Sequence, residues 1–242
     1  MLRDKGLVKE TDKVANYLSE FFPEDVAPKW YDVTIENMLQ HRNGGSGGGE
    51  WNKNIDTNEP NDKDFLFYIF SDKLPYEIGD KIVYCESNYY VISRIIEKIV
   101  GMPVDEWALK NLFNPLHFED VSWGRCPQGH TFCGSGLSLR TRDMAKFGMI
   151  YANNGVYEGR RYLSEEWIKL ATNVFKVDDF GGYGYAVQKT AYMKENEFYL
   201  VGAGDQTVVF RIGKPQVIAF HAAGAGGHLG LLKTVVDIMR ED

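Results

Sequence analysis

The sequence predicts an α+β fold in which a helical region precedes an antiparallel sheet and a closing helix. Apolar residues recur at helical spacing through the middle of the chain. Short strand-like stretches separated by turn residues begin after Gly181, and the chain ends in another helical pattern. We therefore expect one domain made of two parts, a mostly helical region 1–180 and a region 181–242 that holds the sheet strands and the terminal helix.

The bulk composition excludes several classes of protein. The 242 residues are 44% hydrophobic, enough to form a sizeable core. Twenty-seven basic against 34 acidic residues leave a net charge of −7, which argues against a nucleic-acid or anionic-membrane partner. No apolar run is long enough to span a bilayer, so no membrane span is expected. The start, MLRDKGLVKE, lacks the apolar stretch of a secretory signal, which favours a cytoplasmic location.

The first third of the chain predicts short helices separated by loops. Residues 8–20 fit a short helix, and Thr34 fits the N-cap of a helix over 35–41. The glycine-rich and polar stretch 43–62 predicts a loop. Residues 64–71 fit a helix or a strand by their pattern alone.

The middle third predicts longer helices. Isoleucines and valines form a stripe at helical spacing over 89–100, and Gly101 is expected to end that helix. Further helices are expected over 104–112, over 142–153 with Thr141 as N-cap and Asp143 in the first turn, and over 165–172 with Ser164 as N-cap.

The last quarter predicts the sheet. Four strands are expected, over 183–192, 197–201, 207–212 and 217–222. A helix over 229–240 closes the chain.

The cysteines and histidines predict neither a disulfide framework nor a metal site. Cys85, Cys126 and Cys133 cannot complete a disulfide set, so reduced, partly buried thiols are expected, with a Cys126–Cys133 bond as the alternative. Cys126, His130 and Cys133 are one ligand short of a closed zinc site, and the other histidines are scattered. We expect no metal and no cofactor.

Three glycine-flanked segments resemble short catalytic or binding motifs. Ser46 lies in a G-x-S-x-G string, but a nucleophile elbow needs a strand before it and a helix after it, whereas here a helix precedes and a polar loop follows. The Gly224–Gly230 segment suggests a dinucleotide turn, yet no second strand follows, so an ordinary strand-to-helix turn fits better. Ser135, in CGSGL, is expected in a structural turn.

Several segments together resemble one protein family. They are, in order, VTIENMLQHRNGG, LPYEIGDKIVYCESNYYVISRIIEKIVGMPVDEW, GSGLSLRTRDMAKFGMIYANNG and Gly202–Gln206. This series resembles the serine β-lactamase-related superfamily, which comprises class C β-lactamases, D-alanyl-D-alanine carboxypeptidases and β-lactamase-fold esterases. The resemblance runs from about Asp4 to beyond residue 220 and implies a β-lactamase/transpeptidase-like fold that performs acyl transfer.

The resemblance implies roles for two residues before the striped helix. Tyr84 falls on the tyrosine of the family's Tyr-x-Asn motif, which helps to activate a serine and to protonate the leaving group. Glu86 falls where the family has Asn or Asp, and would contact the substrate. Cys85 occupies the middle position.

The resemblance also implies a strand with an oxyanion donor. Gly202, Ala203 and Gly204 correspond to the glycine-rich strand edge whose backbone N–H groups help to bind the oxyanion. Gln206 would be a further substrate contact.

The nucleophile of this family is missing from the sequence. No serine is followed three residues later by lysine, as the family's Ser-x-x-Lys pair requires. Aligning residues 2–24 with the family would put that pair roughly a dozen residues before Met1. The resemblance therefore implies a truncated or inactive hydrolase whose N-terminal strands are missing.

Three functional hypotheses remain open at this stage. The first is the hydrolase, with a small-molecule or peptide substrate and an exposed sheet edge covered by a missing N-terminal segment or by oligomerisation. The second is a non-catalytic binding module for a peptide, a glycan or a protein partner. The third is an enzyme that uses Ser46.

Overall fold

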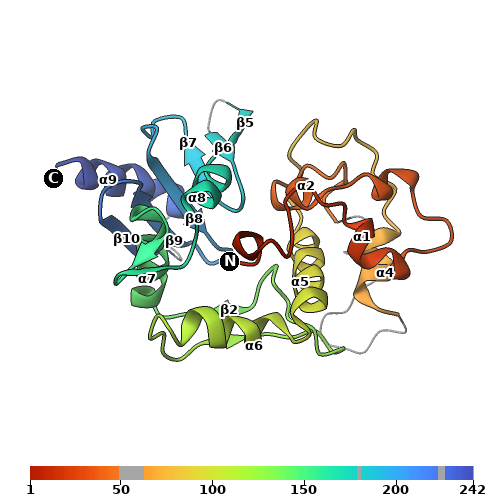
Figure 1. Cartoon of the computed structure of the whole chain (residues 1–242). Helices are drawn as coiled ribbons and strands as arrows, with labels where there is room; N and C mark the ends of the chain where they lie inside the picture. The colour runs from red at the N-terminus through yellow and green to blue at the C-terminus, as the bar shows by residue number, and fades with distance from the viewer. Residues whose placement is uncertain (49–62, 179–180, 223–226, 242) are drawn as a thin grey trace. The chain divides into compact units, whose positions relative to one another are not determined.

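The computed structural model describes residues 1–48, 63–178, 181–222 and 227–241, in two compact units. The helical unit comprises residues 2–117 and 121–138, and the sheet unit comprises Met1, residues 118–120 and residues from 139 onward (Figure 1). The expected polar loop continues into residues 49–62, which lie outside the described ranges. No helix in the described ranges is long and apolar enough to cross a membrane.

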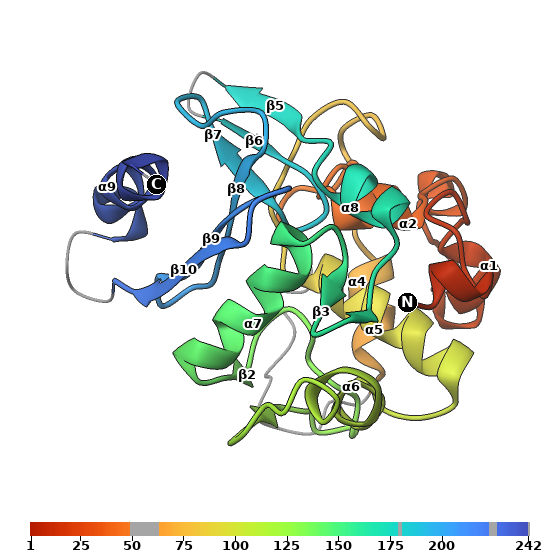
Figure 2. The ribbon, with the colours of Figure 1, turned by 60° about the vertical axis from the view of Figure 1, so that its left-hand side comes forward.

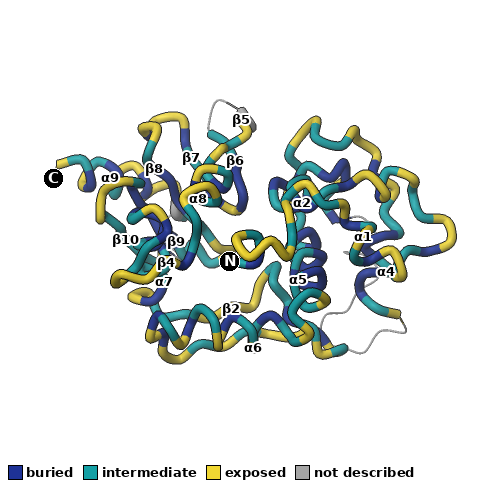
Figure 3. Tube along the Cα trace, in the orientation of Figure 1, coloured by how far each residue is buried: buried dark blue, intermediate teal, exposed yellow. Residues whose placement is uncertain are grey.

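The helical unit is built around helix α5 (Ser87–Val100), against which α1 and α2 pack. The remaining elements are η1 (Arg3–Lys5), α1 (Ala15–Leu18), η2 (Ser19–Phe21), η3 (Pro28–Tyr31), α2 (Ile35–Leu39), α4 (Phe65–Phe70), α6 (Val104–Ala108), the π-helical turn η4 (Leu109–Phe113), and the short strands β1 (Ser122–Trp123) and β2 (Leu137–Ser138). Helix α5 carries buried residues along much of its length (Figure 3). Trp30, Phe65, Phe70 and Tyr90 are fully buried in the core of this unit.

Local signals account for the helices that the sequence predicted correctly. The Thr34 hydroxyl accepts a hydrogen bond from the Asn37 N–H at 3.2 Å, and the Asn37 side chain accepts one from the Thr34 N–H at 2.9 Å. This capping box fixes the start of α2. Gly101 adopts φ 70° and ends α5, as expected. The ambiguous segment 64–71 is helical, because the Asp64 carboxylate caps α4 by accepting from the Leu66 N–H at 2.8 Å.

The predicted helix over 8–20 is wrong in most of its length. Only Ala15–Leu18 is α-helical, followed by one 3₁₀ turn. The Asp12 carboxylate accepts the Lys9 N–H at 2.8 Å, and the Asp12 carbonyl accepts the Ile35 N–H at 3.0 Å. The backbone is therefore bonded to the first residues of α2, and these bonds compete with a local helix.

The sheet unit contains a six-stranded antiparallel sheet in the order β10-β9-β8-β7-β6-β5. Its elements are α7 (Thr141–Ala152), β3 (Val156–Tyr157), β4 (Arg160–Arg161), α8 (Glu165–Ala171), β5 (Phe175–Asp178), β6 (Gly181–Tyr183), β7 (Gln188–Thr190), β8 (Glu197–Val201), β9 (Gln206–Arg211), β10 (Gln216–His221) and α9 (His228–Glu241). The α+β class and the order of helices, antiparallel sheet and closing helix are confirmed.

Helices α7 and α9 cover opposite faces of this sheet (Figure 2). Tyr151 of α7 lies with its ring centroid 5.1 Å from that of Phe210 on β9. The preceding residue, Val209, belongs to the cluster that contains Leu232 and Val236 of α9. Successive strand residues point to opposite faces, so β9 joins both layers of the core.

Two details of the sheet unit correct the sequence predictions. The expected strand 183–192 is interrupted, because Ala186 adopts φ 59° and the Gly184 N–H donates to the Val187 carbonyl in a turn between β6 and β7. Strand β5 was not predicted. At α7 the N-cap is Arg140, not Thr141, and it makes no side-chain cap.

Two other expectations about helix starts hold. The Ser164 side chain accepts from the Trp167 N–H at 3.1 Å and caps α8. Asp143 lies in the first turn of α7, as expected, where its buried carboxylate pairs with Arg140 at 3.0 Å and with Lys146 at 2.8 Å.

Candidate functional site

Tyr84 lies on the turn that leads into α5, with 56% of its surface exposed. The residues on either side of it are bonded to His41. The Val83 N–H donates to the His41 carbonyl at 2.8 Å, and the Cys85 N–H donates to His41 Nδ1 at 3.2 Å. The Tyr84 ring itself lies 4.4 Å, centroid to centroid, from the His41 ring. The phenol is thus solvent-accessible on a turn that is tied to a buried side chain.

The surroundings of Tyr84 keep its phenol protonated at neutral pH. Partial burial is the main cause that raises its pKa, and the nearby Glu86 and Cys85 groups raise it further. A protonated phenol can donate a proton or a hydrogen bond. To act as a base it would need a nearby cation, the part that the Ser-x-x-Lys lysine plays in the family.

Two glycine loops approach the Tyr84–Glu86 segment closely. A Cβ on Gly134 would lie 2.7 Å from the Glu86 carbonyl oxygen, so only glycine fits there. A Cβ on Gly47 would lie 3.6 Å from the Tyr84 carbonyl oxygen. The exposed Ser46 and Ser135 are the neighbours of these glycines in the two loops.

The second group of expected residues forms a turn instead of a strand edge. Gly202–Asp205 connect β8 to β9, with the Asp205 N–H donating to the Gly202 carbonyl at 2.9 Å. Asp205 adopts φ 58°, which breaks the extended backbone. Ala203 is exposed at this turn. The expectation of a strand at these residues is therefore corrected.

The Gln206 side chain lies across this turn. Its Oε1 accepts the Gly204 N–H at 2.9 Å. A Cβ on Gly202 would lie 2.8 Å from the same Oε1, and a Cβ on Gly204 would lie 2.6 Å from Nε2. The side chain therefore occupies the space that both glycines leave, and it uses the N–H that was expected to bind an oxyanion.

The predicted residues form two local groups. Tyr84 and Glu86 lie together in the helical unit, and Gly202–Gly204 lie together with Gln206 in the sheet unit.

Sequence reasoning missed His41, which it treated as one of several scattered histidines. Its side chain is fully buried, and burial lowers its pKa to about 4. The available signal was its place in the VTIENMLQHRNGG segment, shortly before the glycine-rich loop.

Cys85, Cys126 and Cys133 are free thiols. Burial is the main cause that raises the pKa of Cys85, and it raises that of Cys133 to about 12. Cys85 Sγ lies 2.8 Å from the Ser87 hydroxyl, and Cys126 is buried in the helical core. Within the described ranges, no three His, Cys, Asp or Glu residues are grouped as metal ligands would be.

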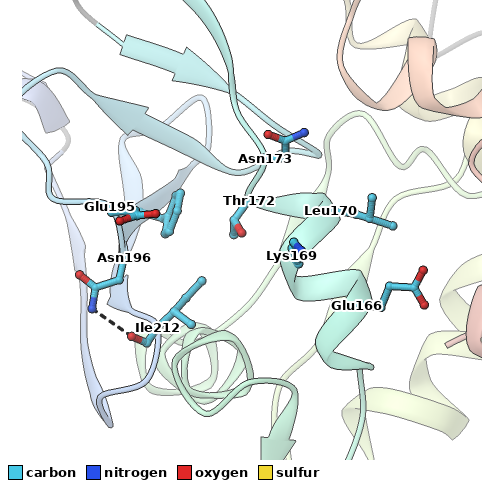
Figure 4. Close-up of a pocket in the computed structure, with 9 residues that line it drawn as sticks. Glu166, Lys169, Leu170, Thr172, Asn173, Glu195, Asn196 and Ile212 are labelled. Atoms are coloured by element: carbon cyan, nitrogen blue, oxygen red, sulfur yellow. Dashed lines mark hydrogen bonds between the residues drawn. The ribbon is translucent and has the colours of Figure 1, made fainter.

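A cavity of about 820 Å³ opens in the sheet unit beside α8 (Figure 4). Leu170, Phe198 and Ile212 supply its apolar wall, and the Asn196 side chain donates to the Ile212 carbonyl at 3.0 Å. Its other lining residues are Glu166, Lys169, Thr172, Asn173 and Glu195. None of the residues singled out from the sequence lines it, and the lining includes no nucleophile paired with a base. The Gly224–Gly230 motif is only partly visible, because residues 223–226 lie outside the described ranges.

Comparison with known proteins identifies the family. The family model described as Beta-lactamase matches residues 1–234. A protein of Escherichia coli O157:H7 named "Putative D-alanyl-D-alanine carboxypeptidase" is 22% identical over 241 residues, covering 79% of this chain and 56% of that protein. The chain thus spans about half the length of this curated relative.

Solved structures share the fold. A structure described as "EstCE1, a hydrolase with promiscuous acyltransferase activity" superposes with a TM-score of 0.77 at 13% identity, over 98% of this chain and 79% of that one. An octameric penicillin-binding protein homologue from Pyrococcus abyssi gives a TM-score of 0.68 at 19% identity, over 90% of this chain and 57% of that one.

Proposed function

The chain belongs to the Beta-lactamase family, and from this premise we propose that it carries the acid–base side of an acyl-transfer site without its own nucleophile. In the proposal, the Tyr84 phenol donates a proton to the leaving group of a small-molecule or peptide substrate, and Glu86 contacts that substrate. The observation that supports this most directly is the placement of a protonated, half-exposed phenol on a turn tied to the protein core.

We propose separately that the turn between β8 and β9, in the sheet unit, contacts a substrate. Gly202–Gly204 would offer backbone N–H groups to the substrate oxygen, and Gln206 would contact the substrate as well. Because Gln206 Oε1 accepts the Gly204 N–H, the glutamine side chain would have to turn away before that N–H could bind an oxyanion.

Because the sequence contains no Ser-x-x-Lys pair, we expect that the 242-residue chain alone forms no acyl-enzyme. The test is intact-mass analysis after incubation with a fluorescent penicillin and, separately, with an aryl phosphonate. No mass increase is expected with either reagent, and a stoichiometric covalent adduct would refute the proposal.

The adduct experiment also decides the Ser46 alternative. A Cβ on Gly47 would lie 3.6 Å from the Tyr84 carbonyl oxygen, so the loop that carries Ser46 approaches the backbone of Tyr84. If a phosphonate adduct forms and disappears in Ser46→Ala but persists in Ser135→Ala, Ser46 is the nucleophile.

A non-catalytic binding module is the second candidate function, favoured by the same missing nucleophile. It predicts reversible binding of a peptide or glycan ligand with no turnover. Titration of the labelled chain with a D-alanyl-D-alanine peptide, followed by NMR, would move the Tyr84 signals under this hypothesis. A matched L-alanyl-L-alanine peptide serves as the control.

The proposal extends to a partner at the edge of the sheet. In the described ranges β10 pairs with β9 alone, and α9 exposes Leu229, Leu231 and Ile238. Unpaired edges and exposed apolar side chains favour association. We expect the chain to be covered there by a further segment or by another copy, since one relative is described as octameric. A monomer that unfolds cooperatively and binds no hydrophobic dye would contradict this part.

A further inference from the structure

His41 holds the backbone on both sides of Tyr84. Its carbonyl accepts the Val83 N–H at 2.8 Å, and its Nδ1 accepts the Cys85 N–H at 3.2 Å. These partners are more than forty positions away along the chain, so the contacts are tertiary. The two bonds fix the peptide groups before and after the residue that carries the phenol.

The direction of the second bond defines the state of the imidazole. A backbone N–H can only donate, so Nδ1 must be unprotonated and the neutral ring must carry its proton on Nε2. Asn88 Nδ2, in the first turn of α5, lies 3.1 Å from the same Nδ1 and supplies a second donor. One acceptor atom therefore joins the Tyr84 turn to the start of the helix.

The ring of His41 is packed as well as bonded. It lies tilted against the Tyr84 ring at 4.4 Å, and edge-on to the Tyr89 ring at 5.0 Å. The residue is fully buried and adopts φ 55°, a left-handed conformation in which His and Asn are enriched. The ring consequently forms a fixed platform under an otherwise exposed phenol.

We propose that His41 is the positioning residue for Tyr84, which it holds through the Nδ1 acceptor and the ring platform. The functional meaning of this inference rests on the proposed role of Tyr84. The physical claim stands on hydrogen bonds that can be measured without any acyl transfer.

The test compares two variants of the 242-residue chain by amide hydrogen exchange. His41→Asn keeps an acceptor near the position of Nδ1 and tolerates positive φ. His41→Phe keeps a ring but has no acceptor. We expect the Cys85 amide to exchange about tenfold faster in His41→Phe, the factor for one lost hydrogen bond, and within about threefold of wild type in His41→Asn.

Two amides serve as internal controls. The Val83 amide is bonded to the His41 carbonyl, which both substitutions retain, so its exchange should change little. The Ile95 amide, within α5, reports on the unit as a whole. If Val83 and Cys85 lose protection equally, the substitution has disturbed the His41 backbone. That result would overturn the proposal that the His41 side chain holds the Cys85 amide. Wild-type protection of Cys85 in His41→Phe would overturn it as well.

A measurement on the wild-type chain keeps the inference testable if a variant fails to fold. Long-range ¹H–¹⁵N spectra report which imidazole nitrogen bears the proton. The inference requires His41 Nδ1 to be unprotonated at neutral pH, and a proton on Nδ1 would refute it. Neither experiment involves a substrate, so failure of the proposed acyl-transfer role would leave both results unchanged.

Discussion

The imidazole of His41 and the phenol ring of Tyr84 lie 4.4 Å apart, centroid to centroid, at an interplanar angle of 42°. One member of this pair is fully buried, whereas the other is 56% exposed. The pair therefore links the core of the helical unit to a group in contact with solvent. A residue that must meet a substrate gains a fixed orientation from such a neighbour.

The buried state of His41 predicts an acid-sensitive fold. Burial lowers its pKa from an ordinary 6.5 to about 4, so the folded chain resists protonation that the unfolded chain accepts. The neutral His41 side chain contributes fully to the free energy of unfolding above pH 6.5. This contribution is lost as the pH falls toward 4, by up to about 3 kcal/mol.

Urea unfolding at pH 7 and at pH 4.5 tests this prediction. Asn does not titrate in this range, so His41→Asn should lose less stability between the two pH values than the wild type does. Carboxylates with lowered pKa values, such as Glu97 and Asp105, also lose their stabilising effect as the pH falls, and they do so equally in the wild type and in His41→Asn. Identical losses in the two chains would contradict the prediction.

The close approach of Gly134 to Glu86 predicts a steric effect of a single methyl group. In Gly134→Ala the new Cβ would meet the Glu86 carbonyl at 2.7 Å and the Glu86 Cβ at 3.0 Å. Because the contact is with backbone at the start of α5, relaxation is difficult, and a loss of about 1–3 kcal/mol is expected.

Gly124→Ala is the matched control for that substitution. A Cβ at Gly124 meets nothing within 4 Å. Its free energy of unfolding should stay unchanged or rise by less than about 1 kcal/mol. Equal stabilities of the two alanine variants in urea would show that the loop next to Glu86 can move.

The structure shows why some elements were predictable from sequence and others were not. The capping box at Thr34 and the left-handed Gly101 are local signals, and the helices they bound were predicted to within two residues at each end. The stretch before Ala15 failed because its backbone partner is Ile35, far along the chain. The break between β6 and β7 depends on Ala186 at φ 59°, a residue type that carries no turn signal.

The candidate site shows the same limit. Tyr84 and Glu86 could be selected because a family motif names their positions. Local pattern did not single out His41, since its side chain and carbonyl are bonded to residues more than forty positions away. The occupation of the Gly204 N–H by Gln206 also depends on a side-chain conformation that no motif encodes.

A buried ion pair predicts how α9 is held on the sheet. Glu197 of β8 is 1% exposed, and its carboxylate accepts from Arg240 at 2.6 and 3.0 Å, with Arg211 Nε at 3.8 Å. Although burial disfavours the charged form, the Arg240 hydrogen bonds leave the pKa of Glu197 below its ordinary value. The pair therefore stabilises the fold above pH 4.5, and this contribution is lost as the pH falls further.

Glu197→Gln should consequently destabilise the chain by about 3 kcal/mol, because two arginines lose their counter-charge. Glu165→Gln is the control, since the exposed Arg161–Glu165 pair at 3.4 Å should contribute less than about 1 kcal/mol. Hydrogen exchange should accelerate first in α9, whose last turn carries Arg240. A uniform acceleration across both units would argue against this local role.

The charge of Glu86 predicts the titration of Tyr84. Burial is the main cause that raises the pKa of the phenol above 10, and the Glu86 carboxylate adds to it. Glu86→Gln removes that charge with little change in shape, so the titration midpoint of the Tyr84 phenol should fall toward the ordinary value.

The midpoint is measured from the ring carbon signal of Tyr84, assigned with Tyr84→Phe. Glu106→Gln, on α6 where the carboxylate pairs with Arg125 at 2.6 Å, serves as control and should leave the midpoint unchanged. A midpoint that does not move in Glu86→Gln would show that the carboxylate is screened from the phenol, and would remove the electrostatic coupling between the two proposed site residues.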